Sequence, residues 1–240
     1  MNTSIKLADV KANARGRLQG NYMQVIFVTI TYFMFVLFIE TFLELFNHDT
    51  SILSFTIGIV ASFIFNAVNI KFKISLYGFY LELASGKKPD SGKIFRSFIR
   101  EGGCKSGLAI SVAVFQQICM LPSNILVFMP DSGSVTYLIT LFAALITGFV
   151  CYILIDIRIM PAYFLVNDIP NISSAKALVT ALWLTKKQVI RILLLRLSFI
   201  PLSIVSALSC GIGFLFVYPY ILTSDACMYQ SLCNMREAAE

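Results

Sequence analysis

Long apolar stretches limit what this chain can fold into more than any other feature of its sequence. Residues 22–46, 52–84 and 135–166 each supply more than the roughly 20 mostly apolar residues that a helix needs to cross a bilayer. Of the 240 residues, 58% are hydrophobic and 13% are charged, whereas a soluble domain is about 25% charged. Because so few polar side chains cannot cover a water-soluble globule, the sequence predicts an all-α polytopic membrane helix bundle.

Polar turns divide the apolar sequence into six predicted transmembrane helices within a single membrane domain, residues 1–240. The predicted helices cover residues 22–46, 52–84, 105–128, 135–166, 189–208 and 214–233. Pro89 and Pro170 end two of them, since proline lacks the N–H that a continuing helix needs. Two further prolines, Pro122 and Pro219, predict breaks inside the third and sixth helices.

A short amphipathic segment precedes each pair of predicted transmembrane helices, so the sequence predicts three repeated units. Ser91 and Lys93 in the second of these segments recur at a fixed offset as Ser174 and Lys176 in the third. The repeat units cover residues 3–84, 91–166 and 173–233. Repeats in membrane proteins often place shared sites between the units, although duplication also serves simply to build a bundle.

The amphipathic segments are predicted to lie on the membrane surface, with apolar side chains toward lipid and basic side chains toward water. In the second segment, Lys93, Arg96 and Arg100 form the polar face. The candidate membrane-surface contacts are Phe95, Phe98, Ile99, Leu178, Leu182 and Trp183.

The distribution of basic residues predicts the orientation of the chain. With six crossings, all 19 Lys and Arg residues fall in the inner half of the membrane or on the side of the N-terminus. Cytoplasmic segments carry such an excess of basic residues, so both termini are predicted to lie in the cytoplasm. The net charge of +6 then indicates contact with anionic lipid headgroups rather than with nucleic acid.

Six charged side chains lie near the cytoplasmic ends of the predicted spans and form the candidate ligand-binding site. They are Lys71, Lys73, Asp156, Arg158, Arg191 and Arg196. Charges inside a span are costly, so Asp156 is expected to pair with Lys73 or with basic side chains beside Arg158. Two interpretations remain open: side chains that extend to the interface, or a cationic vestibule facing the cytoplasm that takes an anionic or amphiphilic ligand.

The sequence offers little for catalysis or for a bound cofactor. His48 is the only histidine, which removes most histidine-assisted nucleophiles and multi-histidine metal sites. No C-x-x-C pair, P-loop, G-x-S-x-G or dinucleotide-binding glycine pattern is present. We therefore expect no enzymatic activity, no metal and no cofactor, and we expect the six cysteines to stay reduced.

Four short motifs follow one another along nearly the whole chain. They are Ala14-Arg15-x-x-Leu18-x-Gly20-Asn21, Leu197-Ser198-Phe199-Ile200, Gly211-Ile212-Gly213 and Pro219-Tyr220. In order and spacing they resemble a bacterial family of six-helix membrane proteins, the domain of unknown function nine hundred and seventy-five. The chain departs from that pattern at Pro201-Leu202, where Gly-Trp is usual, at Lys187, where Gly is usual, and at Ala181, where Ser is usual. The resemblance implies this topology in a bacterial plasma membrane and implies no activity.

Two functions are compatible with this architecture. In the first, the protein is not an enzyme, and it binds or moves a small amphiphile, such as a lipid, peptide or toxin, at the inner charged residues. In the second, it is an interaction or scaffold subunit whose surface helices contact a membrane protein partner or a second copy of the chain. Both functions have the lipid bilayer, with its anionic lipids, as a partner.

Overall fold

An all-α fold runs through the part of the chain that this computed structural model describes, residues 6–44, 52–88, 90–100, 103–128, 135–169, 171–186, 188–209 and 211–237. Within these ranges every regular element is a helix, which confirms the predicted fold class for the described residues. In chain order the helices are α1 (Leu7–Leu18), α2 (Tyr22–Glu44), α3 (Ile52–Ala84), α4 (Ser91–Arg100), α5 (Gly103–Phe128), α6 (Val135–Asp168), α7 (Ser174–Thr185), α8 (Val189–Leu197), α9 (Ile200–Leu208) and α10 (Phe214–Glu237).

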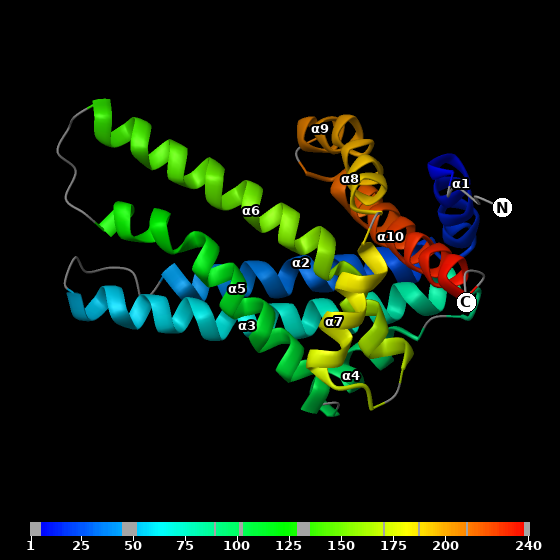
Figure 1. Cartoon of the computed structure of the whole chain (residues 1–240). Coiled ribbons are helices and arrows are strands. Elements are labelled where there is room, and N and C mark those ends of the chain that lie inside the picture. Colours follow the sequence, from blue (N-terminus) through cyan, green and yellow to red (C-terminus); the bar gives the residue numbers. More distant parts are fainter. Residues whose placement is uncertain are drawn as a thin grey trace.

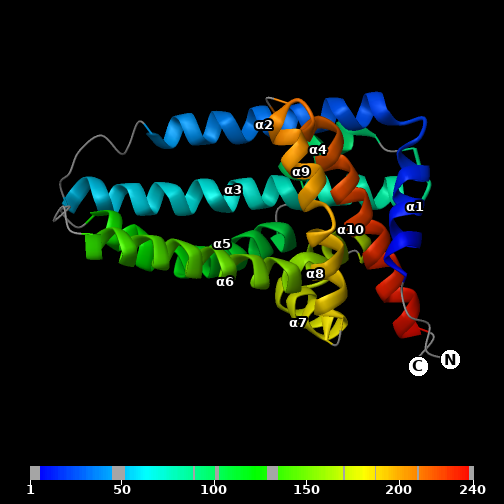
Figure 2. The ribbon, with the colours of Figure 1, turned by 90° about the horizontal axis from the view of Figure 1, so that it is seen from above.

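Four long helices, α2, α3, α5 and α6, form a bundle: they run nearly parallel in Figure 2, whereas in Figure 1 α5 and α6 are inclined to α2 and α3. The short helices α1, α4 and α7 surround one end of this bundle, which we call the inner end. Helices α8, α9 and α10 form an arm that crosses the long helices near the inner end instead of running parallel to them (Figure 2). The arm is held to α1, where the hydroxyl of Tyr220 donates to the carbonyl of Lys11 at 3.4 Å.

Five segments of the described chain are long and apolar enough to cross a membrane. They are Tyr22–Glu44, Thr56–Ala84, Gly103–Leu126, Val135–Asp168 and Val189–Leu208. Their most apolar windows have a mean hydropathy between 1.5 and 2.6. Helix α10, which corresponds to the sixth predicted crossing, does not belong to this set. Six crossings therefore stay a prediction.

Apolar side chains cover the ends of the long helices that point away from the inner end, and they are exposed there. On α6, for example, Phe142, Ile146 and Phe149 are 61%, 62% and 58% exposed. Soluble monomers rarely expose such continuous apolar surface, whereas lipid tails are as apolar as these side chains. Together with the five apolar segments, this surface is that of a multi-pass membrane protein.

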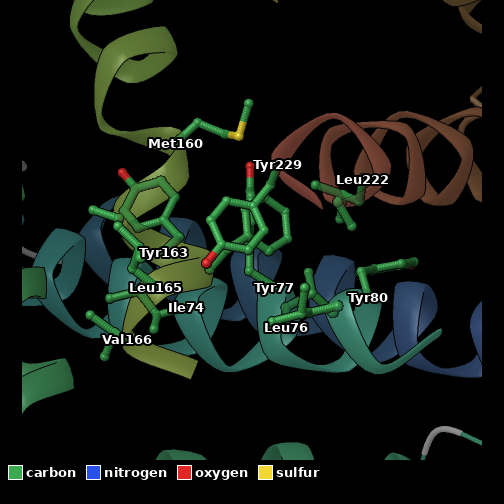
Figure 3. Close-up of a cluster of buried hydrophobic side chains, with 14 of the residues drawn as sticks. Ile74, Leu76, Tyr77, Tyr80, Met160, Tyr163, Leu165, Val166, Leu222 and Tyr229 are labelled. Carbon is green, nitrogen blue, oxygen red and sulfur yellow. The ribbon is translucent and has the colours of Figure 1, made fainter. Parts of the chain in front are cut away.

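The hydrophobic core lies at the inner end, where α3, α6 and α10 meet (Figure 3). Tyr77 of α3 contacts Tyr163 and Phe164 of α6, with ring centroids 5.2 and 4.8 Å apart. Phe164 in turn stacks on Tyr229 of α10 at 5.1 Å. Aromatic pairs at such distances attract one another beyond the area that they bury. The core therefore holds the inner parts of α3 and α6 together and leaves their outer parts to contact lipid.

Proline acts differently in the structure from what the sequence predicts. The bounds predicted for α3 and α4 are confirmed, but the breaks predicted at Pro122 and Pro219 are wrong, since α5 and α10 continue through them. A proline removes only one helical hydrogen bond, in the case of Pro219 the bond to the carbonyl of Leu215. Membrane helices tolerate this loss where neighbouring helices hold the flanking turns.

The break falls instead in the fifth predicted transmembrane helix, which is divided into α8 and α9 at Ser198 and Phe199. Pro201 explains this interruption, because it has no N–H for the carbonyl of Leu197 and its ring crowds that carbonyl. The amide of Phe199 bonds to Arg196, only three residues back, at 3.0 Å. The bend thus follows directly after Arg196 and separates it from α9.

Candidate functional site

Four charged side chains from four helices meet in one network, which we call the charge network. Lys73 of α3 and Arg196 of α8 both pair with Asp156 of α6, at 3.3 Å (Nζ to Oδ1) and 2.7 Å (Nη1 to Oδ2). The same guanidinium pairs through Nη2 with Oδ2 of Asp225, on α10, at 3.1 Å. The side chains of Asp156 and Asp225 are 7% and 1% exposed, and those of Lys73 and Arg196 are 19% and 24% exposed, so the two carboxylates are buried and the two basic side chains are partly buried.

Helices α3 and α6 approach closely beside the charge network because Gly78 has no side chain. A Cβ at Gly78 would lie 2.5 Å from Oδ1 of Asn167. Asn167 occupies that space and donates through Nδ2 to the carbonyl of Ile74 on α3, 2.8 Å away. This contact fixes the register of the two helices, and the register sets Lys73 opposite Asp156.

Contacts of Phe199 with α10 and α1 hold the arm at its bend, three residues after Arg196. Phe199, which follows the bend, packs edge to face on Tyr220 of α10 with ring centroids 5.0 Å apart. The ammonium of Lys11, on α1, lies 4.6 Å from the centre of the Phe199 ring. Since a cation over an aromatic face is attracted to it, α1 supports the arm where it turns.

The formal charges of the network cancel, because Lys73 and Arg196 face two carboxylates. Moving an ion out of water costs several kcal/mol, and a partner offsets this only where the geometry is good. Lys73 has a further favourable contact, since its ammonium lies 5.4 Å from the centre of the Tyr163 ring. The site therefore contains four charged side chains, whose formal net charge is zero. This differs from the cationic vestibule of the sequence analysis, from which Asp225 was missing.

A cavity of about 350 Å³ lies beside the charge network, between the arm and helices α2, α3 and α6. The four charged side chains form one part of its lining, and tyrosines form another. Two of these, Tyr32 and Tyr218, stack face to face with ring centroids 5.5 Å apart. Apolar side chains of α9 and α10, such as Ile200 and Leu222, complete the lining. The cavity thus combines a charged floor with aromatic and aliphatic walls.

The structure brings together three of the six predicted ligand-binding residues, Lys73, Asp156 and Arg196. The other three do not line the cavity. Arg158 is exposed on α6, and Arg191 donates to the side chain of Gln188 at 3.0 Å. The ammonium of Lys71 lies 5.3 Å from the centre of the Phe98 ring. These three side chains fit the alternative interpretation, in which long basic residues extend toward the interface.

Four of the six predicted membrane-surface contacts are exposed on α4 and α7. They are Phe95, Ile99, Leu182 and Trp183, with exposed fractions of 44%, 76%, 44% and 45%. Leu178 is half-buried and packs on the core. Phe98 also packs inward, with its ring 5.5 Å from that of Phe72 on α3, and the exposed apolar side of α4 is therefore narrower than the sequence predicts.

Asp225 is the functional residue that sequence reasoning missed in composing the site. Its signal was present, because Asp225 is the one carboxylate in the predicted transmembrane helix of residues 214–233, and a carboxylate inside a span is by itself a candidate functional group. The tyrosines Tyr32, Tyr77 and Tyr218 gave no such signal, since tyrosine is common in helices of membrane proteins. Only the crossing of the arm over α2 and α3 brings them together.

A second cavity, of about 310 Å³, lies at the inner end between α3, α4, α5 and α6. Two of its three basic side chains have partners: Lys105 donates to Oγ of Ser97 at 2.6 Å and to Oδ1 of Asn167 at 2.7 Å, and Lys93 pairs with Glu82. Because these groups are engaged with one another, we place the candidate site at the cavity beside the charge network.

The groups of the candidate site are suited to holding a charged head and an apolar body, and its lining contains no histidine or cysteine. Throughout the described ranges, no three His, Cys, Asp or Glu side chains lie close enough together to hold a metal ion.

No protein-family model, no curated protein and no solved structure matches this chain.

If the balance of charges within the network stabilises the fold, removing one carboxylate should lower the thermal unfolding temperature. Asp156→Asn leaves two partly buried cations with one carboxylate, and removing one partner of a buried pair costs up to about 3–5 kcal/mol. Adding Lys73→Met restores a balanced pair of Arg196 and Asp225. We therefore expect a lower thermal unfolding temperature in detergent for Asp156→Asn, and a partial recovery in the double variant.

Arg158→Gln provides the control for this experiment, since Arg158 is exposed and outside the network. It should unfold at the temperature of the unchanged protein. A double variant that is no more stable than Asp156→Asn alone would show that charge balance does not govern the stability of this site.

Proposed function

We propose that this chain is a non-enzymatic integral membrane protein that binds or moves a small amphiphilic molecule, whose head lies at the charge network. The observation that carries the proposal is the cavity of about 350 Å³ beside Lys73, Asp156, Arg196 and Asp225. Ligand cavities of this size typically have apolar walls and a few placed polar groups that orient the ligand. The candidate cavity has both.

The apolar walls of the cavity give the body of an amphiphile a place to lie. Ile200 and Leu222 belong to the lining, and Ile200 is at the same time 48% exposed. The lining therefore continues to the outer surface of α9, which is apolar. An acyl chain or apolar side chain can pass along this surface into lipid, while its polar head stays beside Arg196.

We also propose a position for the bilayer. Helices α3 and α6 have 33 and 34 residues, about 50 Å at 1.5 Å per residue, whereas the hydrocarbon core of a bilayer is about 30 Å thick. If the exposed outer parts of these helices span the hydrocarbon, the charge network lies near its inner edge. The basic helices α1, α4 and α7 then meet anionic headgroups, in a bacterial plasma membrane with both termini cytoplasmic.

The arm does not run parallel to the long helices, and we propose that it enters the bilayer from the cytoplasmic side and turns back within it. In both views the end of α9 that leads into α10 lies level with about the middle of α2 and α3, and nearer the inner ends of α5 and α6 (Figure 1, Figure 2). The amides of residues 211–214 all donate to acceptors within the chain, at 2.9 to 3.3 Å. These four described amides are therefore not left unpaired if they lie in lipid. In this topology only α2, α3, α5 and α6 cross the bilayer fully. Four crossings, like the six predicted from the sequence, place both termini on the same side of the membrane.

An internal duplication is part of the same proposal. Helices α3 and α4 begin at Ile52 and Ser91, and α6 and α7 begin at Val135 and Ser174. Both pairs differ by the 83 residues that also separate Lys73 from Asp156. We infer that the two central units arose as copies and now contribute one residue each to the charge network.

A second candidate function, an interaction or scaffold subunit, is favoured by the exposed side chains on the surface helices. Ile99 of α4 and Val179 of α7 are 76% and 66% exposed. A partner protein or a second copy of the chain could cover them. Contact with the membrane interface accounts for the same exposure, so the cavity makes ligand binding the better supported function.

Cysteine labelling tests the proposed topology. In a cysteine-free background, single cysteines replace Val135, Ile212 or Lys87, and intact cells receive a membrane-impermeant maleimide. We expect labelling at position 135 from outside, labelling at position 87 only after permeabilisation, and none at position 212 from outside. Labelling of position 212 as readily as position 135 would instead support six crossings.

Native mass spectrometry of the full chain in a mild detergent tests the binding function. We expect the extracted protein to carry an adduct with the mass of a membrane amphiphile. Arg196→Gln removes the head contact and Ser203→Phe fills the cavity with a larger side chain, so each should reduce the adduct at least tenfold.

Two matched variants keep this experiment specific. Arg158→Gln removes an exposed arginine, and Val205→Phe adds the same aromatic ring at an exposed position of the same helix, α9. Both should retain the adduct. Equal adduct on Ser203→Phe and Val205→Phe would show that no ligand occupies the cavity.

A further inference from the structure

Two buried polar atoms of the charge network have no hydrogen-bond partner. They are Nε of Arg196, which is a donor, and Oδ1 of Asp225, which is an acceptor. Asp225 is 1% exposed and lines the cavity, so its free oxygen is not satisfied by bulk water. Buried polar groups in folded proteins are nearly always paired, and a buried polar atom without a partner, which we call an orphan atom, needs an explanation, such as a ligand or an ion that binds there.

The two orphan atoms belong to one ion pair, in which Nη2 of Arg196 and Oδ2 of Asp225 are 3.1 Å apart. A ligand that satisfies both must offer an acceptor to the arginine and a donor to the carboxylate. An oxyanion supplies the first, because guanidinium binds carboxylate and phosphate strongly. An ammonium group supplies the second, because it carries N–H donors and a positive charge.

Charge balance points to the same ligand. The two basic and two acidic side chains of the network already cancel, so a lone anion or a lone cation would add a net charge to a buried site in a membrane protein. Such a charge is expensive. A zwitterion adds none, since its own charges cancel as well.

The walls of the cavity suit the cationic half of such a molecule. Tyr32, Tyr77 and Tyr218 line it together with Asp225, and aromatic faces attract ammonium groups. A quaternary ammonium has no N–H and leaves Oδ1 of Asp225 unpaired, whereas a primary ammonium pairs with it. The volume of about 350 Å³ holds a headgroup but not a whole lipid.

We propose that the ligand head is a zwitterion with a primary ammonium beside Asp225 and an oxyanion beside Arg196. This inference rests on the proposed function and narrows its ligand to one chemical class. Two sources share that chemistry, the phosphoethanolamine headgroup of a lipid and a free amino acid.

Isothermal titration calorimetry on the full chain in nanodiscs of phosphatidylglycerol tests the proposal, because this lipid supplies no zwitterion. The probes are glycerophosphoethanolamine, glycerol 3-phosphate, ethanolamine, glycerophosphocholine and L-alanine. Glycerophosphoethanolamine should bind at least tenfold more tightly than the anion, the cation or the quaternary zwitterion. Binding of L-alanine in the same range assigns the site to free amino acids, and its absence assigns it to a lipid headgroup.

Asp225→Asn adds a readout that simple damage to the site would not produce. This variant gives the network a net positive charge, so its preference should reverse and glycerol 3-phosphate should bind more tightly than glycerophosphoethanolamine. Arg158→Gln, outside the cavity, should keep the original order. If Asp225→Asn does not fold, the probe series on the unchanged chain decides the matter alone.

Two results would overturn the inference. If glycerol 3-phosphate binds the unchanged chain as tightly as glycerophosphoethanolamine, the ligand is an anion, and the proposed binding of an amphiphile still stands. If no probe binds, the head is not of this class; the adduct in native mass spectrometry then decides separately whether the cavity binds an amphiphile at all.

Discussion

The guanidinium of Arg196, held between Asp156 and Asp225, is the interaction on which the arrangement of this protein depends. It joins α8 to α6 and α10 in one contact, at 2.7 and 3.1 Å, and Lys73 extends the network to α3. Charges of this kind are stable inside a membrane protein only when they pair. Any packing of the arm that separated them would leave buried charges alone, so the network selects the crossing of the arm over the long helices.

The charge network lies between two ends of the molecule whose side chains differ in polarity and packing. At the inner end, aromatic side chains such as Tyr77 and Tyr163 fill the space between helices, and polar groups pair with one another. At the other end, α6 exposes rows of side chains such as Phe142, whose natural solvent is lipid. The cavity lies where these regions meet, beside both charges and apolar walls. A molecule with a charged head and an apolar body matches both.

Much of this could be predicted from the sequence, because the bilayer imposes simple local rules. The length of the apolar segment 52–84 predicted the bounds of α3. The offset of 83 residues between the repeats predicted that Lys73 lies opposite Asp156. Other features depend on packing between distant segments. The sequence marks Asp225 as an intramembrane charge, but only the path of α10 reveals its partner. Phe98 belongs to an apolar face, yet the close approach of α4 to α3 turns it inward. Pro201 interrupts the fifth predicted transmembrane helix, whereas α5 and α10 continue through Pro122 and Pro219, and no local sequence rule distinguishes the two outcomes.

Solid-state NMR of the chain in lipid bilayers tests this account most directly. With ¹⁵N in the arginine side chains and ¹³C in the aspartate carboxyls, dipolar couplings report which groups are in contact. The account predicts one guanidinium coupled to two carboxyl carbons at ion-pair distance, and the loss of one of these couplings in Asp225→Asn. A spectrum in which no guanidinium is coupled to two carboxyl carbons would contradict it.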